Sequence, residues 1–576
     1  MIESLRVALL DTGLVQSFSG VRTVFGLGPG IRKEHETLAA AYGYCYAADV
    51  LAGRGQASLV LGRDPRPTGN EIVRAIARGF IAWARNSGCE IELIDLGIIT
   101  TPLAQTSVRA LNVDGGVIVT ASHNPIEHNG FKFLSGVASA GDRLTSPPGA
   151  LISALVMNRI IGRVVECSID SCLIDNVTLD EVDEALGDGK NEISRVTAER
   201  AYLDVIGRDW GITPHCLKPL TLGPVLLDPN GGAGCGIDAR VLEHFGVRVI
   251  EINNELGYPE HSIDTDGIDP ASGRHMLLRL ARAAARAGAH FAVAFDYDAD
   301  RGNLVLPGHE ESAIVPPQQV ATFNVALALA RRRLTGGRGP LAVVMSDSTS
   351  LASHRVAEAF GAEIFQVETG EINVVTRMHD LRMQGYDVPV GVEGANGGTI
   401  YESSTCRDGL QVALSAAQAE STPEVACEWM HLVSGMNGCR FDDSQQLALP
   451  ELIESVPVNS NIMLKLSTPS IPHGEVKRRM EEYFSKSLWT VLQSRFESYE
   501  FQNFEGMEMP SERTGDESGA WRLMLRSSKG RSFIFFRGSR TEAGVWRMII
   551  DADDASDFAE LKDMAQQMFA ITAVEG

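Results

Sequence analysis

The sequence predicts an α/β protein with three similar α/β domains, whose sheets are mixed and mainly parallel, and a C-terminal α+β domain. Two observations lead to this fold class. Short aliphatic runs that suit buried strands alternate with amphipathic helical segments in three successive rounds. Strands connected through helices pair mainly in parallel. Beyond about residue 435 this alternation stops, and strand-like segments follow one another directly.

The first round occupies the N-terminal part of the chain. Residues 57–62 (ASLVLG) read as a buried strand, and further strands are expected at 91–95 and 117–120. Between the first two strands, hydrophobic residues recur at helical spacing: Ile72, Val73, Ile76, Phe80 and Trp83. This order is that of a strand–helix–strand unit.

The second and third rounds repeat the same order. The second consists of VLLD at 225–228, helix-like ARVLEHF, and the strands RVIEI and AHFAVAFD. The third consists of LAVVMSD at 341–347, helix-like ASHRVAEAF, and the strands AEIFQV and DVPVGVE. Their similar cadence predicts related domains, although no repeat is visible residue by residue.

The last part of the chain predicts a smaller α+β domain. AWRLMLRSS and RSFIFFRG read as strands across a short connection, and a helix is expected to begin near Asp554. The predicted domains are 1–200, 201–315, 316–435 and 436–576. Two segments, 137–200 and 445–515, fit none of the patterns and are interpreted as insertions.

Composition excludes several classes of partner. The net charge of −23 argues against nucleic acid and against an anionic membrane, but not against a small phosphorylated ligand, which needs only a local cluster of cations. We find neither an apolar run of about 18 residues nor a signal peptide. The 9 cysteines are scattered without a C-x-x-C pair, which predicts reduced thiols and a cytoplasmic protein.

The first candidate site is the segment VIVTASHNPIEHNGFK, residues 117–132. Its buried strand ends in Ser122 and His123, followed by asparagines and Lys132. A serine hydroxyl becomes a useful nucleophile when a base or a cation lies beside it. The alternative is a serine that caps the turn after the strand.

The second candidate is the aspartate triplet in AFDYDADRG, which predicts a magnesium site. Asp296, Asp298 and Asp300 alternate, so in an extended loop their carboxylates share one side and need a cation between them. An EF-hand would have glycine in place of Arg301 and an acid in place of Pro307, which excludes that type of calcium site. Carboxylates completed by a phosphate oxygen suit Mg²⁺. The alternative is a solvated acidic turn.

The third candidate, FFRGSRTEAGVWR, predicts a phosphate site. Guanidinium groups bind phosphate oxygens bidentately, and hydroxyls with backbone N–H groups can complete the cradle. The residues concerned are Arg537, Ser539, Arg540, Thr541 and Arg547. The alternative is a hairpin turn with surface arginines.

Three further turns carry weaker signals. In GVEGANGGTI, Glu393 and Asn396 could hydrogen-bond the vicinal hydroxyls of a sugar. In GRDPRPTG, the prolines indicate an ordinary turn whose arginines Arg63 and Arg66, with Asp64, could shape the nucleophile loop. DPNGGAGCG lacks the last glycine of G-x-G-x-x-G, so a dinucleotide site is not favoured.

Taken in this order, the motifs resemble those of the α-D-phosphohexomutase superfamily over essentially the whole chain. T-A-S-H-N-P at 120–125 with N-G-x-K at 129–132 resembles its phosphoserine loop, and D-x-D-x-D-R at 296–301 its magnesium loop. Ser19, Gly20 and Arg22 look like its amino-terminal S-G-I-R element. The resemblance implies four domains around a central cleft.

Details of the later motifs resemble a branch rich in archaeal phosphoglucosamine and phosphomannose mutases. GEINV, which starts at Gly370 and Glu371, and EGANGG followed by RDG at 407–409 are similar to that branch. This chain carries Ala395 as an extra residue in the sugar loop. In the phosphate loop, Arg540 replaces a small residue and Ala543 replaces a proline.

The resemblance implies a mechanism. Phosphorylated Ser122 gives its phosphoryl group to a hexose phosphate, and the other phosphate of the bisphosphorylated sugar then returns to the serine. Mg²⁺ would be bound by the phosphoserine and the three aspartates, and a hexose 1,6-bisphosphate would act as activator. Lys132 would handle the proton, aided by His123 and Arg22. The resemblance assigns the sugar phosphate to Arg301, Glu393, Asn396, Gly370 and Glu371, and the non-reacting phosphate to the arginines and hydroxyls of the phosphate loop.

The substrate remains open between related sugars. Glucose or mannose phosphate is favoured narrowly, with phosphoglucosamine mutase activity or a non-catalytic phosphosugar-binding paralogue as alternatives. A Mg²⁺-dependent phosphatase needs the same groups, whereas a serine hydrolase is excluded because Ser122 lacks the G-x-S-x-G context. The protein is expected to be an isomerase that works as a monomer or homodimer.

Overall fold

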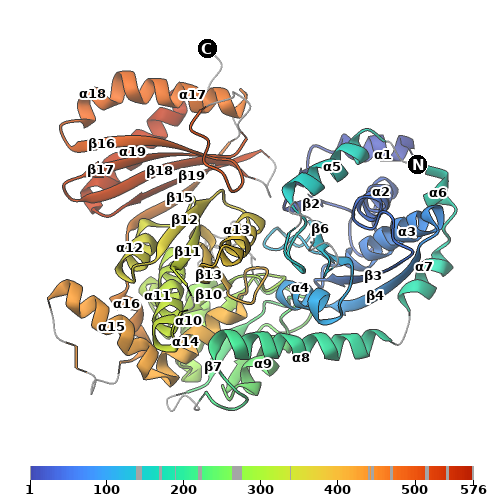
Figure 1. Cartoon of the computed structure of the whole chain (residues 1–576), viewed down its shortest axis with the longest axis horizontal. Helices are drawn as coiled ribbons and strands as arrows, with labels where there is room; N and C mark the ends of the chain where they lie inside the picture. The colour runs from blue at the N-terminus through green and yellow to red at the C-terminus, as the bar shows by residue number, and fades with distance from the viewer. Residues whose placement is uncertain are drawn as a thin grey trace. The chain divides into compact units, whose positions relative to one another are not determined.

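The structure is a computed structural model that divides into two compact units, each described by itself. Unit 1 contains Met1–Val315 and Ile400–Ser421, and unit 2 contains Pro316–Thr399 and Thr422–Gly576 (Figure 1). The described residues are 2–137, 146–167, 171–187, 190–217, 223–261, 276–337, 339–438, 441–442, 447–467, 471–512, 518–539 and 544–573. Four sheets with covering helices confirm the α/β fold class.

The first sheet of unit 1 has six strands in the order β1-β2-β6-β5-β3-β4. β3 pairs in parallel with β4 and β5, whereas β6, β2 and β1 add antiparallel pairs. The elements are α1 (Ile2–Leu9), β1 (Val15–Ser17), β2 (Gly20–Thr23), α2 (Lys33–Val50), β3 (Gln56–Arg63), α3 (Gly69–Ser87), β4 (Glu90–Ile98), α4 (Thr101–Ala110), β5 (Gly115–Val119) and β6 (Asn129–Ser135). The strands expected at 57–62, 91–95 and 117–120 are confirmed, as is the helix between the first two.

Segment 137–200 forms helices in its described parts. These are α5 (Ala154–Val165), α6 (Ser171–Asp175), α7 (Leu179–Leu186) and the start of α8 (Lys190–Trp210). Val156, Ile160 and Val182 join the hydrophobic core made by α2, α3 and the sheet. The segment therefore belongs to the core of this part of unit 1.

The second sheet of unit 1 has the order β10-β9-β7-β8, with β7 parallel to β8 and β9, and β10 antiparallel to β9. Its elements are β7 (Val225–Asp228), α9 (Ile237–His244), β8 (Val249–Glu251), α10 (Met276–Ala287), β9 (Ala292–Phe295) and β10 (Gly302–Val305). The strand expected at 225–228 has the same bounds in the structure. α14 (Leu410–Ser421) also belongs to unit 1.

Unit 2 contains the third sheet, in the order β12-β11-β13-β14, in which β11 is parallel to β12 and β13. Its elements are α11 (Pro317–Thr335), β11 (Leu341–Ser346), α12 (Leu351–Ala359), β12 (Glu363–Val367), α13 (Glu371–Met383), β13 (Asp387–Glu393), β14 (Gly398–Tyr401), α15 (Pro423–Asn437) and α16 (Leu449–Ser455). The boundary between the units falls inside β14, because the chain returns to unit 1 at Ile400. The division into four domains stays a prediction.

The fourth sheet is antiparallel, with five strands in the order β15-β19-β18-β17-β16. Its elements are β15 (Ser460–Ser467), α17 (His473–Tyr483), α18 (Trp489–Leu492), β16 (Phe496–Phe504), β17 (Ala520–Ser527), β18 (Gly530–Gly538), β19 (Val545–Ala552) and α19 (Ala555–Thr572). Segment 445–515 supplies both edge strands, so its interpretation as an insertion is wrong. Asp554 caps α19, as expected.

Candidate functional site

Ser122 lies in the turn that follows β5. Its φ of +53° is in the left-handed region, which a residue with a side chain adopts only when its surroundings hold it there. Its amide donates to Thr120 Oγ1 at 2.8 Å, and its Oγ donates to Asp296 Oδ2 at 2.8 Å. The residue is 1% exposed. The turn thus points the hydroxyl at the aspartate triplet.

A buried arginine fixes this turn. Arg66 contacts Asp64 through Nε at 3.1 Å, and Asp64 in turn accepts from Thr120 Oγ1 at 2.7 Å. The guanidinium of Arg66 donates to four carbonyl oxygens of the serine loop, those of Ser122, Asn124, Pro125 and His128. The expectation that an arginine of GRDPRPTG shapes the nucleophile loop is thereby confirmed. His123 lies half-buried in the same loop.

The three aspartates occupy the turn between β9 and β10. Their carboxylate oxygens lie within 4.8 Å of one another and are buried. Ala299, inside the turn, has a φ of +58°. The expectation of an extended loop is wrong, because the chain turns here, but the carboxylates do gather at one place.

Cationic side chains surround the triplet. Lys132 Nζ lies 3.3 Å from Asp298 Oδ2 and 3.7 Å from Asp300 Oδ2, and Arg407 Nη2 lies 2.5 Å from Asp300 Oδ2. Arg301 Nε lies 3.4 Å from Asp300 Oδ1. These contacts place three cations around Asp300.

The pKa values of two carboxyl groups, those of Asp296 and Asp300, are shifted in opposite directions. Burial raises the pKa of Asp296 well above its usual value, and the charges of Asp300 and Asp298 add to this effect. Burial also opposes ionisation of Asp300, but Arg407, Lys132 and Arg301 hold its pKa well below its usual value. A cation bound here would favour the ionised form of Asp296 as well.

Arg22 is the amino-terminal member of this group. It lies on β2, opposite Gly130 of β6. Burial lowers its pKa to about 10, against the opposing charge of Asp298. Its Nε and Nη1 have no hydrogen-bond partner in the described part of the chain. Gly20, at the start of β2, has a φ of +113°, and a Cβ there would lie 2.4 Å from the carbonyl oxygen of Phe131, which accounts for the glycine.

The donor set fits a divalent cation. Asp298 Oδ1 and Asp300 Oδ1 are buried oxygens without a hydrogen bond from any described residue. Orphaned carboxylate oxygens are costly unless a cation or another donor satisfies them. Carboxylates and a phosphate oxygen are ligands that suit Mg²⁺. The triplet could therefore bind a metal.

The predicted sugar residues lie in unit 2. Glu393 ends β13, and its Oε1 accepts from the amide of Gly370 at 2.7 Å. Gly370 precedes α13, which begins with Glu371. Asn396 accepts from the amide of Gly398 at 2.9 Å, and the extra residue Ala395 packs against an apolar cluster made by Leu351 of α12 and residues of the fourth sheet. The structure brings Glu393 and Gly370 together.

Part of the predicted phosphate loop lies at the end of β18. Arg537 donates to the carbonyl oxygen of Thr369 and lies 3.5 Å from Glu368 Oε1. Arg547 lies opposite Arg537 in the pairing of β18 with β19, and the amide of Ser539 donates to Val545 O at 2.8 Å. Arg540, Thr541 and Ala543 lie outside the described residues.

Sequence reasoning missed several side chains at these sites. Thr101, at the start of α4, donates to Asp298 Oδ2 at 2.8 Å. Glu368 and Asp347 lie beside Arg537 in unit 2, where burial raises the pKa of Asp347 to about 7 despite the nearby Arg537. Only Arg407 had a signal in the sequence, the R-D-G that follows the sugar loop.

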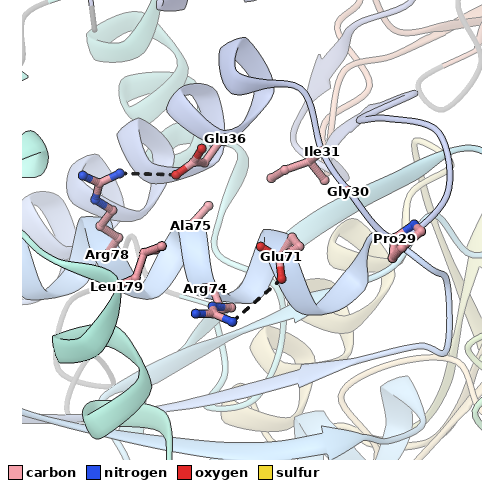
Figure 2. Close-up of a pocket in the computed structure, with 9 residues that line it drawn as sticks. All are labelled: Pro29, Gly30, Ile31, Glu36, Glu71, Arg74, Ala75, Arg78 and Leu179. Carbon is pink, nitrogen blue, oxygen red and sulfur yellow. Dashed lines mark hydrogen bonds and ion pairs between the residues drawn. The ribbon is translucent and has the colours of Figure 1, made fainter.

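One pocket in unit 1 lies away from these groups. Its volume is about 420 Å³, and α2, α3, the segment Pro29–Ile31 and Leu179 line it. Figure 2 shows its charges paired, Arg78 with Glu36 and Arg74 with Glu71. None of its lining residues belongs to the serine loop or to the aspartate triplet. Among the described residues, no helix combines the length and the apolar character needed to cross a membrane.

A buried serine hydroxyl on a carboxylate cluster bordered by cations is the arrangement that phosphoryl transfer needs. Fold and site thus define a class, the enzymes that transfer phosphoryl groups. Residues 16–144 match the family model of phosphoglucomutase/phosphomannomutase α/β/α domain I, and residues 322–427 match that of domain III.

The chain is 30% identical over 427 residues to the phosphoglucosamine mutase of Clavibacter michiganensis subsp. michiganensis, covering 71% of this chain and 84% of that protein. It is 27% identical over 375 residues to the phosphoglucosamine mutase of Moorella thermoacetica, covering 64% and 72%. The chain belongs to the α-D-phosphohexomutase superfamily and is a phosphohexomutase, an isomerase of the intramolecular phosphotransferase type.

Solved structures share the fold. A phosphoglucomutase/phosphomannomutase family protein from Burkholderia thailandensis has a TM-score of 0.63 at 18% identity, covering 97% of both chains. The open form of pp63/parafusin, a phosphoglucomutase from Paramecium, has a TM-score of 0.60 at 16% identity, covering 93% of this chain and 91% of that one.

Proposed function

We propose that this phosphohexomutase interconverts the 1- and 6-phosphates of a hexose or hexosamine through phosphorylated Ser122, with Mg²⁺ at the aspartate triplet. One observation carries the proposal. Ser122 Oγ, held in a left-handed turn, donates to Asp296 Oδ2 at 2.8 Å. A serine that only capped its turn would bond to the backbone nearby. The contact with Asp296 instead joins two motifs 174 residues apart.

The charges of the site support a phosphorylated serine. When all three carboxylates are ionised, the four cations Arg22, Lys132, Arg301 and Arg407 leave about one net positive charge. A bound Mg²⁺ would raise this to about three, which a phosphate dianion on Ser122 would largely neutralise. By this count the phosphate alone would leave about one net negative charge, and both ligands together would leave about one net positive charge.

Each residue of the site then has a step in the mechanism. When bound, Mg²⁺ would withdraw charge from the phosphoryl group. Arg66 keeps the serine turn in place, and Lys132, in contact with Asp298, is the proton-handling group for the sugar hydroxyl, with His123 and Arg22 beside the reacting oxygens. Arg301 binds the reacting phosphate. A hexose 1,6-bisphosphate would phosphorylate the resting enzyme.

The residues of unit 2 supply recognition in this proposal. Glu393, Asn396, Gly370 and Glu371 bind the sugar hydroxyls, while Arg537, Ser539 and Arg547, with Arg540 and Thr541, bind the phosphate that is not reacting. The support is that Thr369, which accepts from Arg537, directly precedes Gly370, which donates to Glu393. One short turn therefore connects the sugar group to the phosphate group.

The choice of sugar has support on two sides. The motifs favoured glucose or mannose phosphate narrowly, whereas the similar proteins from Clavibacter and Moorella are phosphoglucosamine mutases. The extra Ala395 packs against the apolar cluster, and Glu393 still accepts from Gly370. We place glucosamine phosphate beside glucose and mannose phosphate as a candidate substrate.

The test follows conversion of single hexose 1-phosphates by ³¹P NMR, with Mg²⁺ and a trace of glucose 1,6-bisphosphate. Glucose, mannose, glucosamine and N-acetylglucosamine 1-phosphates are tested one at a time, beside a Ser122→Ala control. We expect the 6-phosphate of at least one sugar to form and the control to be silent. Release of inorganic phosphate instead would indicate a phosphatase, and silence from protein that carries phosphate on Ser122 would favour a binding-only paralogue.

A further inference from the structure

The R-D-G segment, residues 407–409, follows β14 and belongs to unit 1. Its arginine reaches the aspartate triplet, where Arg407 Nη2 lies 2.5 Å from Asp300 Oδ2. The contact joins residues that are 107 positions apart in the sequence. Because Asp300 is a candidate metal ligand, this contact can affect how Asp300 is oriented toward a metal.

In both Asp298 and Asp300, one carboxylate oxygen accepts hydrogen bonds from residues that the structure describes and the other does not. Asp298 Oδ2 accepts from Thr101 Oγ1 at 2.8 Å and from Lys132 Nζ at 3.3 Å, and Asp300 Oδ2 accepts from Arg407. In both residues Oδ1 receives no hydrogen bond from the described chain. The hydrogen bonds from the described residues thus go to one oxygen of each carboxylate, and the other oxygen of Asp300 has only the ion-pair contact with Arg301 Nε at 3.4 Å.

The other residues of the segment hold Arg407 in place. Asp408 Oδ2 accepts from Tyr202 OH at 2.7 Å and from Gln411 Nε2 at 3.0 Å, and Gln411 Oε1 accepts from Trp210 Nε1 at 3.1 Å. Tyr202 and Trp210 belong to α8 and are buried. These hydrogen bonds attach the segment to a long helix that lies outside the metal turn.

Gly409 brings the segment against the metal turn itself. Its amide donates to the carbonyl oxygen of Ala299 at 3.1 Å. A Cβ at this position would lie 2.5 Å from the backbone carbon and oxygen of Arg301. Only glycine permits this approach, which brings the neighbouring Arg407 within reach of Asp300.

We propose that Arg407 is a positioning residue for the divalent cation. Its guanidinium holds Asp300 Oδ2, so that Asp300 Oδ1 faces the metal. The inference rests on the proposed metal site at the triplet. Partners of metal ligands commonly act in this way, and their loss lowers metal affinity about 10–100-fold. Charge alone predicts the opposite sign, since removing a cation beside the site would strengthen metal binding.

The test measures binding of Mn²⁺ by electron paramagnetic resonance in the whole protein, in which free and bound ions give different signals. We expect Arg407→Gln to weaken binding about 10–100-fold. Arg109→Gln is the matched control, because Arg109 Nη2 donates to Ser403 O at 2.8 Å in the same stretch of chain but does not contact the triplet. The control should bind Mn²⁺ as the wild type does.

A second variant separates positioning from loss of fold. Arg407→Lys keeps the charge but not the planar fork, so it should bind Mn²⁺ more weakly than the wild type while circular dichroism is unchanged. If Arg407→Gln does not fold, the lysine variant decides alone. Equal or tighter binding in the folded variants would overturn the inference. A wild type that binds no Mn²⁺ would instead remove the proposed metal site, and this inference with it.

Discussion

The two units of the molecule each hold a buried acidic cluster, and the clusters are satisfied differently. In unit 1, side chains donate hydrogen bonds to the aspartate triplet, namely those of Ser122, Thr101, Lys132 and Arg407. In unit 2, backbone amides serve the acids. Gly370 donates to Glu393, Gly506 donates to Glu368 at 2.9 Å, and Thr369 donates to Asp347 at 3.0 Å.

The difference reflects what each cluster can bind. Side-chain cations and hydroxyls leave two Oδ1 atoms without a hydrogen bond in unit 1, an arrangement that a metal ion completes. Backbone amides carry no net charge and are fixed by the fold, so in unit 2 they orient the carboxylates, while Arg537 lies beside Glu368. The first arrangement suits a charged ligand, and the second suits hydroxyl groups that must be held in one orientation.

The first prediction concerns turnover at the aspartate triplet of unit 1. Asp298→Asn removes a carboxylate that contacts Lys132 and is a candidate metal ligand. Turnover should fall about 10²–10³-fold, as on removal of one group that stabilises transition-state charge. The rate is measured with the sugar phosphate that the wild type converts. Asp95→Asn, in β4, where Asp95 accepts from the amide of Gly97, is the control. A variant with more than half of the wild-type rate would mean that the triplet carries no catalytic charge.

The dependence of unit 1 on side-chain donors is tested at Arg66. Arg66→Met leaves Asp64 buried without its ion pair and removes the donors to the serine loop. The free energy of unfolding of unit 1 should fall by about 3–5 kcal/mol. Urea unfolding measures the change, with Arg63→Met, at the end of β3, as the control. An unchanged midpoint would show that the backbone alone fixes the loop.

In unit 2, the corresponding test is Glu368→Gln. The amide side chain can still accept from Gly506, but it loses the charge that faces Arg537 at 3.5 Å. We expect KM for the sugar phosphate to rise about 10-fold with little change in kcat, because a charged contact is worth about 1.5–3 kcal/mol. Glu363→Gln, at the exposed start of β12, is the control. A fall in kcat without a change in KM would place Glu368 in the chemistry instead.

The last prediction concerns pH. Burial raises the pKa of Asp347 to about 7 in the folded protein, from the ordinary aspartate pKa of 3.8. Between these two pH values the folded protein keeps a proton on Asp347 that the unfolded chain has lost. Stability therefore falls as pH rises from about 4 to about 7. Asp347→Asn should reduce this fall by on the order of 2 kcal/mol. Urea unfolding at pH 5 and pH 8 measures it, and Ser348→Ala is the neutral control. Equal pH dependence in wild type and variant would contradict the assignment.

Local sequence determined the elements and the motifs. VLLD and DVPVGVE became β7 and β13 with the expected bounds, because their hydrophobic runs and flanking turns suffice to define buried strands. The start of α19 is also local, because the side chain of Asp554 accepts from backbone amides two and three residues later. The aspartate triplet marked three carboxylates that do lie together, but a turn gathers them and not the extended loop from which the spacing argument began.

Tertiary structure alone decided which distant groups meet. Nothing local to Thr101 indicates that it donates to Asp298, and segment 445–515 supplies edge strands whose partners lie far along the chain. The sequence marked R-D-G as a motif, but only the approach of Gly409 to Arg301 brings Arg407 to Asp300. Spacing along a chain specifies neighbours within one element, whereas the hydrogen bonds that complete this site depend on how separate elements pack.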